Sequence, residues 1–238
     1  MRVRRFLLFT FLTLAHAPAS SLGAQAPRRP PEPSHPLISG KQVLAAGLIL
    51  TMTLVGDQGL RGEFQEHRGN TTNSIAEVGN AVGEPRYLLP ASGAGYLVGQ
   101  LIGDHGLSRA ALHAGGAALV AGGLTTALKF AVGRSRPSQG DDADVFRPLS
   151  GWNSFPSGHT ALAFAVATAI ADETEDRWSD VALYGVAATT AFARVNDDRH
   201  WTSDVLAGAL VGHLSARWLS RRHRLTAGPG ALGITLEF

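Results

Sequence analysis

Six apolar segments separated by polar stretches dominate the chain and predict a helical protein. They span residues 43–55, 87–102, 110–132, 161–171, 181–192 and 205–219. The polar stretch from Asp57 to Arg86 predicts a solvated loop, with a short helix at 70–81. We therefore expect an all-α fold, a bundle of about six helices whose functional site lies where the helix ends converge.

The two ends of the chain depart from the helical pattern. Residues 1–24 have a basic start, a short apolar core and small residues after it, which predict a secretory signal peptide, with an uncleaved anchor as the alternative. Residues 25–40 are rich in proline and predict an extended linker. Residues 41–224 then form the predicted helical domain, and residues 225–238 end in an apolar alternation that predicts a short strand.

Two settings for the helical domain are open, a membrane-embedded bundle and a soluble exported domain. The length and the small residues of the segment 110–132 favour the membrane. The segment 43–55 is shorter than the roughly 20 residues that a membrane span requires. The basic residues from Arg217 to Arg224 predict a cytoplasmic or lipid-headgroup edge. We expect a cell-envelope protein among inner-membrane lipids with its site facing the periplasm, and a soluble periplasmic protein is the alternative.

Composition excludes several classes of site. The chain has no cysteine, which rules out disulfides, thiolate catalysis and cysteine-ligated zinc. Its net charge is +2, and no basic face interleaved with aromatic residues predicts a nucleic-acid partner. The chain has nineteen arginines but two lysines, so Lys129 stands out among the cations. The sequence has no signal for the oligomeric state.

Three polar clusters lie at the ends of apolar segments. They are Lys129–Pro137, Pro156–His159 and Arg194–Asp204. If these ends converge, three cations, two histidines and one carboxylate share one pocket, which describes an anion site. Among the cations, the guanidinium groups of Arg136 and Arg194 grip phosphate oxygens in pairs, while Lys129 acts as a point charge.

The second cluster has the features of a helix start that binds an anion. Ser157 is placed to cap the helix that follows, which leaves free backbone N–H groups near Gly158 and His159. Gly158 has no side chain that would block the approach of an oxyanion to the backbone. His159 then stands beside the anion as a proton donor or acceptor.

The third cluster places His200 and Asp204 four residues apart, on one face of a helix. At that spacing the carboxylate accepts one imidazole N–H and fixes the other nitrogen as the unprotonated, nucleophilic one. Four further histidines show no metal-ligand spacing and are interpreted as structural: His67, His105, His113 and His213.

Together the clusters resemble the motifs of the type 2 phosphatidic acid phosphatase and vanadium haloperoxidase superfamily: Lys-x6-Arg-Pro, Pro-Ser-Gly-His and Arg-x5-His-x3-Asp. All three occur in order, and the resemblance covers about residues 87–220. One departure is Ala193, where many members have serine. The resemblance implies a phosphoric monoester or diphosphate hydrolase, of the acid phosphatase or lipid phosphate phosphatase type, that needs no metal and no cofactor.

The resemblance also implies a role for each motif residue. His200 would attack phosphorus to give a phosphohistidine, Asp204 would orient it, and His159 would protonate the leaving oxygen and then activate water. The catalytic set is thus His200, His159 and Asp204. The phosphate-binding set is Lys129, Arg136, Ser157, Gly158 and Arg194.

We expect a metal-independent phosphatase that acts on a lipid phosphate or diphosphate. Two alternatives are a vanadate-dependent haloperoxidase, in which the same cations hold vanadate, and a helical envelope protein without catalysis. The sequence does not distinguish phosphatidic acid, phosphatidylglycerol phosphate, an isoprenyl diphosphate and a soluble ester as substrates.

Overall fold

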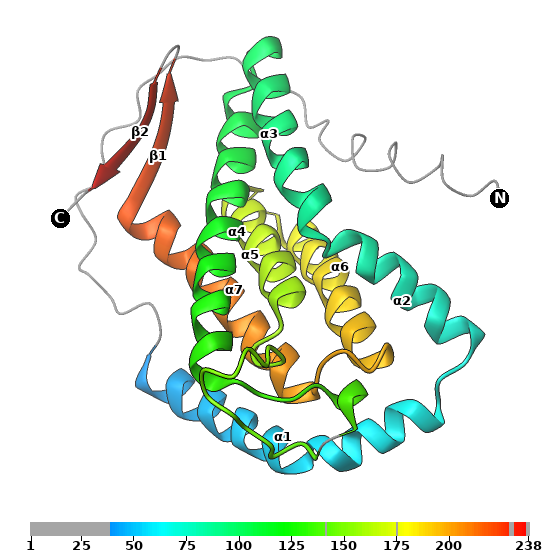
Figure 1. The fold of residues 1–238 in the computed structure, drawn as a ribbon. Helices are drawn as coiled ribbons and strands as arrows, with labels where there is room; N and C mark the ends of the chain where they lie inside the picture. Colours follow the sequence, from blue (N-terminus) through cyan, green and yellow to red (C-terminus); the bar gives the residue numbers. More distant parts are fainter. Residues whose placement is uncertain (1–38, 141, 175, 229–230, 237–238) are drawn as a thin grey trace. The chain divides into compact units, whose positions relative to one another are not determined.

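The computed structural model describes residues 39–140, 142–174, 176–228 and 231–236, with side chains described as far as residue 220. In these residues the chain forms seven α-helices, one short 3-10 helix and two strands (Figure 1). The helices are α1 (Gly40–Glu66), α2 (Asn70–Val82), α3 (Pro85–Ile102), α4 (His105–Val132), α5 (Gly158–Thr174), α6 (Arg177–Asn196) and α7 (Thr202–Arg222). The prediction of an all-α bundle is confirmed. The predicted signal peptide, and the predicted linker as far as residue 38, lie outside the described residues.

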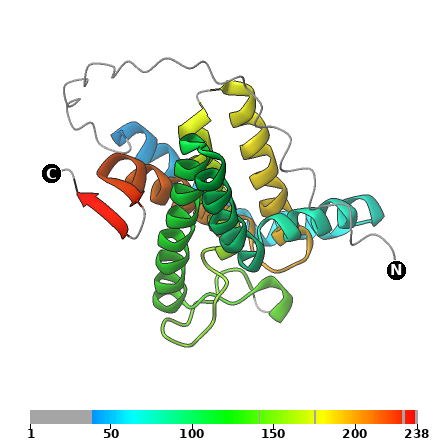
Figure 2. The ribbon, with the colours of Figure 1, turned by 90° about the horizontal axis from the view of Figure 1, so that it is seen from above.

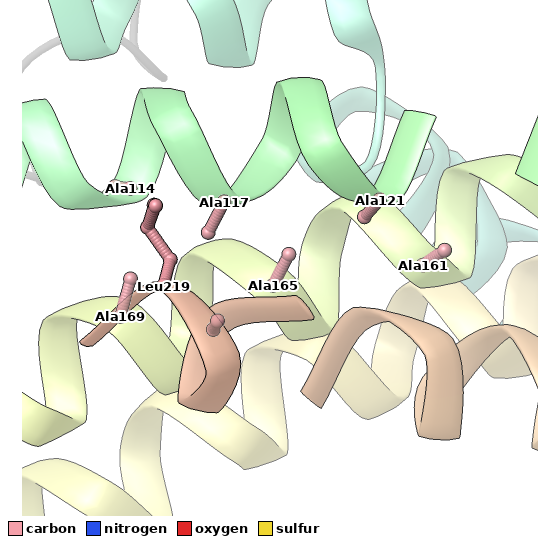
Figure 3. Close-up of a cluster of buried hydrophobic side chains, with 8 residues drawn as sticks. Ala114, Ala117, Ala121, Ala161, Ala165, Ala169 and Leu219 are labelled. Atoms are coloured by element: carbon pink, nitrogen blue, oxygen red, sulfur yellow. The ribbon is translucent and has the colours of Figure 1, made fainter. Parts of the chain in front are cut away.

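Helix α5 is the centre of the bundle and packs against α4, α6 and α7 (Figure 1). The side chains buried between α4, α5 and α7 are mostly alanine: Ala114, Ala117, Ala121, Ala161, Ala165, Ala169 and Ala216, together with Leu219 (Figure 3). A Cβ on Gly212 of α7 would meet the backbone oxygen of Ala161 at 2.1 Å. Small residues therefore let the backbones of α5 and α7 touch, as they do in membrane bundles.

The other elements surround this centre. Helix α2 packs against α6, and α3 packs against α4 (Figure 2). A loop of residues 133–157 joins α4 to α5 and contains the 3-10 helix Pro137–Gln139. After α7, β1 (His223–Gly228) and β2 (Ala231–Leu236) form an antiparallel hairpin. β2 contains the alternating residues that predict a strand, whereas the sequence analysis does not predict β1.

Most of the stretch from Asp57 to Arg86 is helical. The predicted short helix at 70–81 is confirmed as α2, whereas the prediction of a solvated loop around it is wrong. α1 continues into the stretch as far as Glu66, and α2 and α3 take up nearly all of the rest. Asp57, which is interpreted above as a solvated charge, is fully buried. The physical reason is an ion pair at 2.8 Å with Arg134, which lies 77 residues further along the chain. No local pattern reveals such a partner.

Two helices, α1 and α4, are long and apolar enough to cross a membrane. Helix α1 is longer than the apolar segment 43–55 predicts. A capping box formed by Ser39 and Gln42 starts the helix earlier, and it has 27 residues in all. The apolar residues of α1 are largely exposed: Leu44 is 76% exposed and Val55 is 84% exposed. A continuous apolar surface of this kind is typical of contact with lipid or with another protein.

Candidate active site

Four helix ends deliver the predicted site residues to one end of the bundle. Lys129 lies in the last turn of α4, His159 in the first turn of α5, and Arg194 in the last turn of α6. Asp204 lies in the first turn of α7, whereas His200 precedes that helix. The prediction that both residues lie on one face of a helix is therefore wrong, although the two side chains do face each other. The loop between α4 and α5 comes back to the same place, as the contacts described below show.

Close contacts join these helix ends. The N–H of Ser157 donates to the backbone oxygen of Asp204 at 2.9 Å, which ties the start of α5 to α7. A Cβ on Gly158 would lie 3.8 Å from Cε of Lys129, which places the start of α5 against the end of α4. A Cβ on Gly208 would meet the backbone oxygen of Ser157 at 2.4 Å, so glycine alone fits there. The helix ends therefore converge, as the sequence predicts.

His200 and Asp204 form a buried pair. Nδ1 of His200 lies 3.5 Å from Oδ2 of Asp204, which is an ion-pair distance rather than that of a tight hydrogen bond. The Asp204 carboxylate also accepts the backbone N–H of Trp201 at 3.0 Å and the hydroxyl of Ser154. These contacts fix the carboxylate. Nδ1 of His200 faces it without a hydrogen bond among the described residues, which leaves Nε2 on the far side of the ring.

The surroundings of His200 keep its imidazole neutral. Burial lowers the pKa of His200 to about 4, and the positive charges of Lys129 and Arg136 act in the same direction, while Asp204 opposes them. At neutral pH the ring therefore carries one proton. With Nδ1–H directed at Asp204, the lone pair on Nε2 is available, which is the form that a nucleophile needs.

Asn153, in the loop before α5, binds two cations of the first cluster, Lys129 and Arg136. The ammonium group of Lys129 donates to the backbone oxygen of Asn153 and, at 3.3 Å, to that of Ser154. Nε of Arg136 donates to the side-chain oxygen of Asn153 at 3.0 Å. Burial and the nearby Arg199 lower the pKa of Arg136, which indicates that positive charges are crowded here.

Ser157 and Gly158 form the start of α5. The backbone oxygen of Ser157 accepts the N–H of Ala161 at 3.0 Å, so Ser157 occupies the N-cap position. Its buried hydroxyl lies 2.9 Å from that of Thr160 and is engaged within the helix. The first N–H groups of α5, those of Gly158 and His159, have no acceptor inside a helix and are the natural donors for an anion.

His159 faces an acid from the start of α3. Its Nε2 lies 3.7 Å from Oε2 of Glu84, the residue that precedes that helix. Burial and the charge of Arg194 lower the pKa of His159, and Glu84 opposes them. The His159 side chain is 30% exposed, so a leaving group is able to reach it.

Arg194 is held by α2. Its Nη1 donates to the side-chain oxygen of Asn80 at 2.7 Å, and Nδ2 of Asn80 donates to Asp197 at 2.6 Å. Nε of Arg194 is buried and has no acceptor among the described residues. A buried donor without an acceptor costs free energy. An oxyanion bound beside Arg194 would supply the missing acceptor.

Sequence reasoning missed several residues that hold the site together. Arg134 lies inside the first cluster but outside its motif, and its buried guanidinium donates to Asp204 at 2.8 Å. Three others come from segments without a motif: Asp57, Asn80 and Asn153. For Arg134 alone there is a sequence signal, because it is a third basic residue in a cluster at the end of an apolar segment.

The arrangement is suited to bind an oxyanion beside a nucleophile. Lys129, Arg136 and Arg194 supply positive charge, and the start of α5 supplies backbone donors. A buried neutral imidazole next to such a site is suited to attack on a phosphorus atom. In the part of the chain that the structure describes, no three His, Cys, Asp or Glu side chains are grouped as a metal site.

Comparisons with known proteins cover the helices that form this site. Residues 110–226 match the family model of the PAP2 superfamily. The Lipid A 1-phosphatase of Porphyromonas gingivalis is 46% identical over 104 residues, which are 42% of this chain and 21% of that protein. The Lipid A 4'-phosphatase of Bacteroides thetaiotaomicron is 32% identical over 108 residues, 42% of this chain and 48% of that protein. The match thus spans about a fifth of one relative and about half of the other.

Two solved structures have a similar fold. The crystal structure of Aquifex aeolicus LpxE aligns with a TM-score of 0.53 and 22% identity, covering 67% of this chain and 92% of that one. A PAP2 type phosphatidylglycerolphosphate phosphatase from Bacillus subtilis aligns with a TM-score of 0.55 and 20% identity, covering 74% of this chain and 93% of that one. At these identities the likeness concerns the fold.

Proposed function

Because the chain belongs to the PAP2 superfamily, we propose that it is a metal-independent phosphatase that removes phosphate from a lipid phosphate or diphosphate through a phosphohistidine intermediate. The observation that carries the proposal is the buried pair of His200 and Asp204 at the converging helix ends. The charges of Lys129 and Arg136 act on His200, and Arg194 in turn lies close enough to act on Lys129 and to be acted on by Arg136. In this proposal the three cations neutralise the phosphate charge, a task that metal ions perform in many other phosphatases.

In the first step, Nε2 of His200 attacks the phosphorus atom. The P–N bond forms while the bond between phosphorus and the ester oxygen breaks, and His159 gives a proton to that oxygen. Asp204 keeps Nδ1–H of His200 in place and offsets the positive charge that develops on the ring. The alcohol leaves, and the phosphoryl group stays on His200.

In the second step, water attacks the phosphohistidine. His159, now neutral, takes a proton from the water as the P–O bond forms and the P–N bond breaks. Inorganic phosphate leaves, and His200 returns to its neutral form. The use of one residue as acid and then as base is worth roughly 10² to 10⁴ in rate.

The phosphate oxygens are held by charge that is in place before the substrate arrives. Lys129, Arg136 and Arg194 bind the equatorial oxygens in this proposal. The N–H groups at Gly158 and the positive end of the α5 dipole act on the same oxygens, with Ser157 shaping the helix start. Preorganised donors of this kind supply most of the catalysis in phosphoryl transfer.

A lipid is the proposed carrier of the phosphate. α1 and α4 are long and apolar enough to cross a membrane, and the curated relatives are named as lipid A phosphatases. A phosphomonoester of lipid A is therefore the first substrate to test. Phosphatidic acid, phosphatidylglycerol phosphate and an isoprenyl diphosphate follow it.

The proposed setting is the inner membrane, with the site on the periplasmic side. Helix α7 has Asp204 in its first turn and Arg217, Arg221 and Arg222 in its last turns. Basic residues collect on the cytoplasmic side of membrane proteins. If α7 follows that rule, its His200 end faces the periplasm, where an exported lipid phosphate is accessible.

Phosphate release by the purified full chain in detergent micelles tests the proposal. The assay contains EDTA, offers the lipid phosphates above beside a soluble aryl phosphate, and compares the wild type with His159→Ala and His200→Ala. We expect release from at least one lipid substrate with the chelator present, and loss of release in both variants. Full activity in either variant, or complete loss with chelator alone, would overturn the mechanism.

A further inference from the structure

Helix α1 is joined to the rest of the protein through a buried carboxylate. Among its 27 residues, all of them described, only Asp57 is buried, and its side chain has no exposed surface. An ionised carboxylate is costly to bury without partners. Asp57 accepts the backbone N–H of Ser203 at 2.9 Å, the hydroxyl of Ser203, and a guanidinium N–H of Arg134 at 2.8 Å. The Asp57 carboxylate therefore sits at the N-terminal end of α7.

Arg134 connects Asp57 with Asp204 of the candidate site. Its Nη2 donates to Asp57 and its Nη1 donates to Asp204, both at 2.8 Å. The remaining N–H groups donate to the backbone oxygen of Ala143, at 2.9 and 2.6 Å, and to the hydroxyl of Ser203, at 2.7 Å. All five donors of the guanidinium thus have an acceptor, which leaves it one orientation.

One cation between two carboxylates, all fully buried, is an expensive arrangement. A buried ion pair seldom adds net stability, because the loss of hydration offsets the attraction, and one use that remains is to fix a geometry. Here the ion pairs fix the orientation of the Asp204 carboxylate. One of its oxygens faces Arg134, and the other lies 3.5 Å from Nδ1 of His200.

We propose that Asp57 and Arg134 are positioning residues that hold Asp204 in the orientation in which it aligns His200, so that α1 forms part of the active site. Asp57 lies outside the residues 110–226 that match the family model. Without the Asp57 carboxylate, Arg134 pairs with Asp204 alone and draws it away from His200. The inference rests on the proposed function, because it concerns the step that His200 carries out.

A second ionic contact of α1 provides a matched control. Arg61 lies four residues after Asp57, on the same face of the helix. It donates twice to the carboxylate of Asp198, at 2.7 Å in each case. This contact docks α1 on the loop between α6 and α7. None of the described contacts of Arg61 is to Arg134 or Asp204.

The first experiment compares Asp57→Asn with Arg61→Gln in the purified full chain. Asparagine keeps the size of the side chain and removes its charge. We expect Asp57→Asn to lower kcat by about tenfold with KM unchanged, because the chemical step is misaligned while substrate binding is intact. Arg61→Gln should change kcat by less than about twofold. Equal losses in the two variants, or an unchanged kcat in Asp57→Asn, would overturn the inference.

A double-mutant cycle separates positioning from a general loss of folded protein. In an Asp204→Asn background there is no carboxylate to position, so Asp57→Asn should lower kcat by less than about twofold further. A repeated tenfold loss in that background means that Asp57 acts through folding or docking, and the inference fails. Rates are measured at high enzyme concentration, because Asp204→Asn is itself slow.

Thermal unfolding in detergent reports whether each variant is folded. If Asp57→Asn does not fold, Ser203→Ala takes its place, because it removes the hydroxyl between Asp57 and Arg134 and keeps both charges. Its expected loss in kcat is about threefold, again absent when Asp204 is replaced. Failure of the proposed function gives a different result. In that case the wild type releases no phosphate, or His200→Ala still releases it, whatever Asp57→Asn does.

Discussion

A histidine faces a carboxylate at each end of the α4–α5 pair. At one end, Nδ1 of His113 in α4 lies 2.9 Å from Oε1 of Glu173 in α5. At the other, Nδ1 of His200 lies 3.5 Å from Oδ2 of Asp204. Lys129, at the His200 end of α4, is about 24 Å along the helix from His113. The closer of the two pairs is the one for which we propose no chemistry.

The surroundings of the two pairs explain this difference. The His200 end has the N-terminus of α5, whose N–H groups and positive dipole attract an anion, whereas Glu173 lies at the C-terminus of α5, which repels one. The side chains of His200 and Asp204 are 2% and 0% exposed. The cation beside Glu173 is Arg109, which is 64% exposed and screened by solvent. A histidine and a carboxylate are thus a candidate oxyanion site at the end where a helix start and partly buried cations accompany them.

The largest expected effect comes from removing the imidazole at each end in turn. His200→Ala should lower phosphate release by about 10⁴-fold or more, because the nucleophile is lost. His113→Ala should keep the rate within about threefold of the wild type. Both rates are measured on the same lipid substrate with purified protein. Losses of similar size would show that the His113 end takes part in the reaction.

Trapping the intermediate sharpens the same comparison. A substrate with labelled phosphate should leave label on the wild type and on His113→Ala, and none on His200→Ala. Phosphohistidine is stable in alkali and is lost in acid, so the trapped label should behave in that way. Label that survives acid would point to a serine or threonine ester and remove His200 from its proposed role.

The second largest effect is expected from replacing a cation at each end of the α4–α5 pair. Arg194→Gln removes a donor from the proposed transition state and should lower kcat by about 10² to 10³-fold. Arg109→Gln removes an exposed partner of Glu173 and should change kcat by less than about twofold. Steady-state kinetics on the two variants and the wild type make the test. A small effect of Arg194→Gln would mean that its free Nε is not an anion donor.

The third effect concerns the fall of the reaction rate at acid pH. Burial lowers the pKa of His200 to about 4, so the neutral nucleophile is present above that pH and is lost as the pH falls through it. A nucleophile with the ordinary histidine pKa of about 6.5 would be roughly 30-fold weaker at pH 5. Single-turnover rates between pH 4 and 8 distinguish the two cases. An acid limb near pH 6.5 would contradict the neutral, buried state of His200.

The residues proposed for chemistry were predictable because each breaks an apolar pattern. His159 and His200 lie at the ends of apolar segments, where the packing of a helix does not require a polar residue. Asp204 follows His200 by four residues, which is a helical spacing. Lys129 is conspicuous because the chain has two lysines. The helix starts and ends were predicted less well. Caps such as Ser39, and last turns made of polar residues, extend each helix beyond its apolar part.

The residues that hold the site could not be predicted, because their partners are remote in the sequence. Asp57 lies just after the apolar segment 43–55 and begins a stretch that contains several other charges, which is the pattern of a solvated helix end. Its burial depends on α1 lying against α7, a contact between helices that periodicity does not encode. Asn80 reaches Arg194 in the same way, from α2.

The smallest expected effect concerns Glu84, the acid beside the proposed proton donor. Burial and Arg194 lower the pKa of His159, and Glu84 opposes them, so Glu84→Gln should lower that pKa further. The protonated His159 that the first step needs is then lost at a lower pH. The basic limb of kcat/KM should move to lower pH, and the rate at pH 8 should fall on the order of threefold, while the acid limb set by His200 stays in place.

Glu173→Gln is the matched control for this change, because it removes the carboxylate that faces His113 at the other end of α5. It should move neither limb of the profile. A loss of equal size at every pH in Glu84→Gln would show that Glu84 acts on binding or folding. The contact between His159 and Glu84 would then be a structural contact of the same kind as that between His113 and Glu173, and the two ends of α5 would differ in their cations and helix dipole alone.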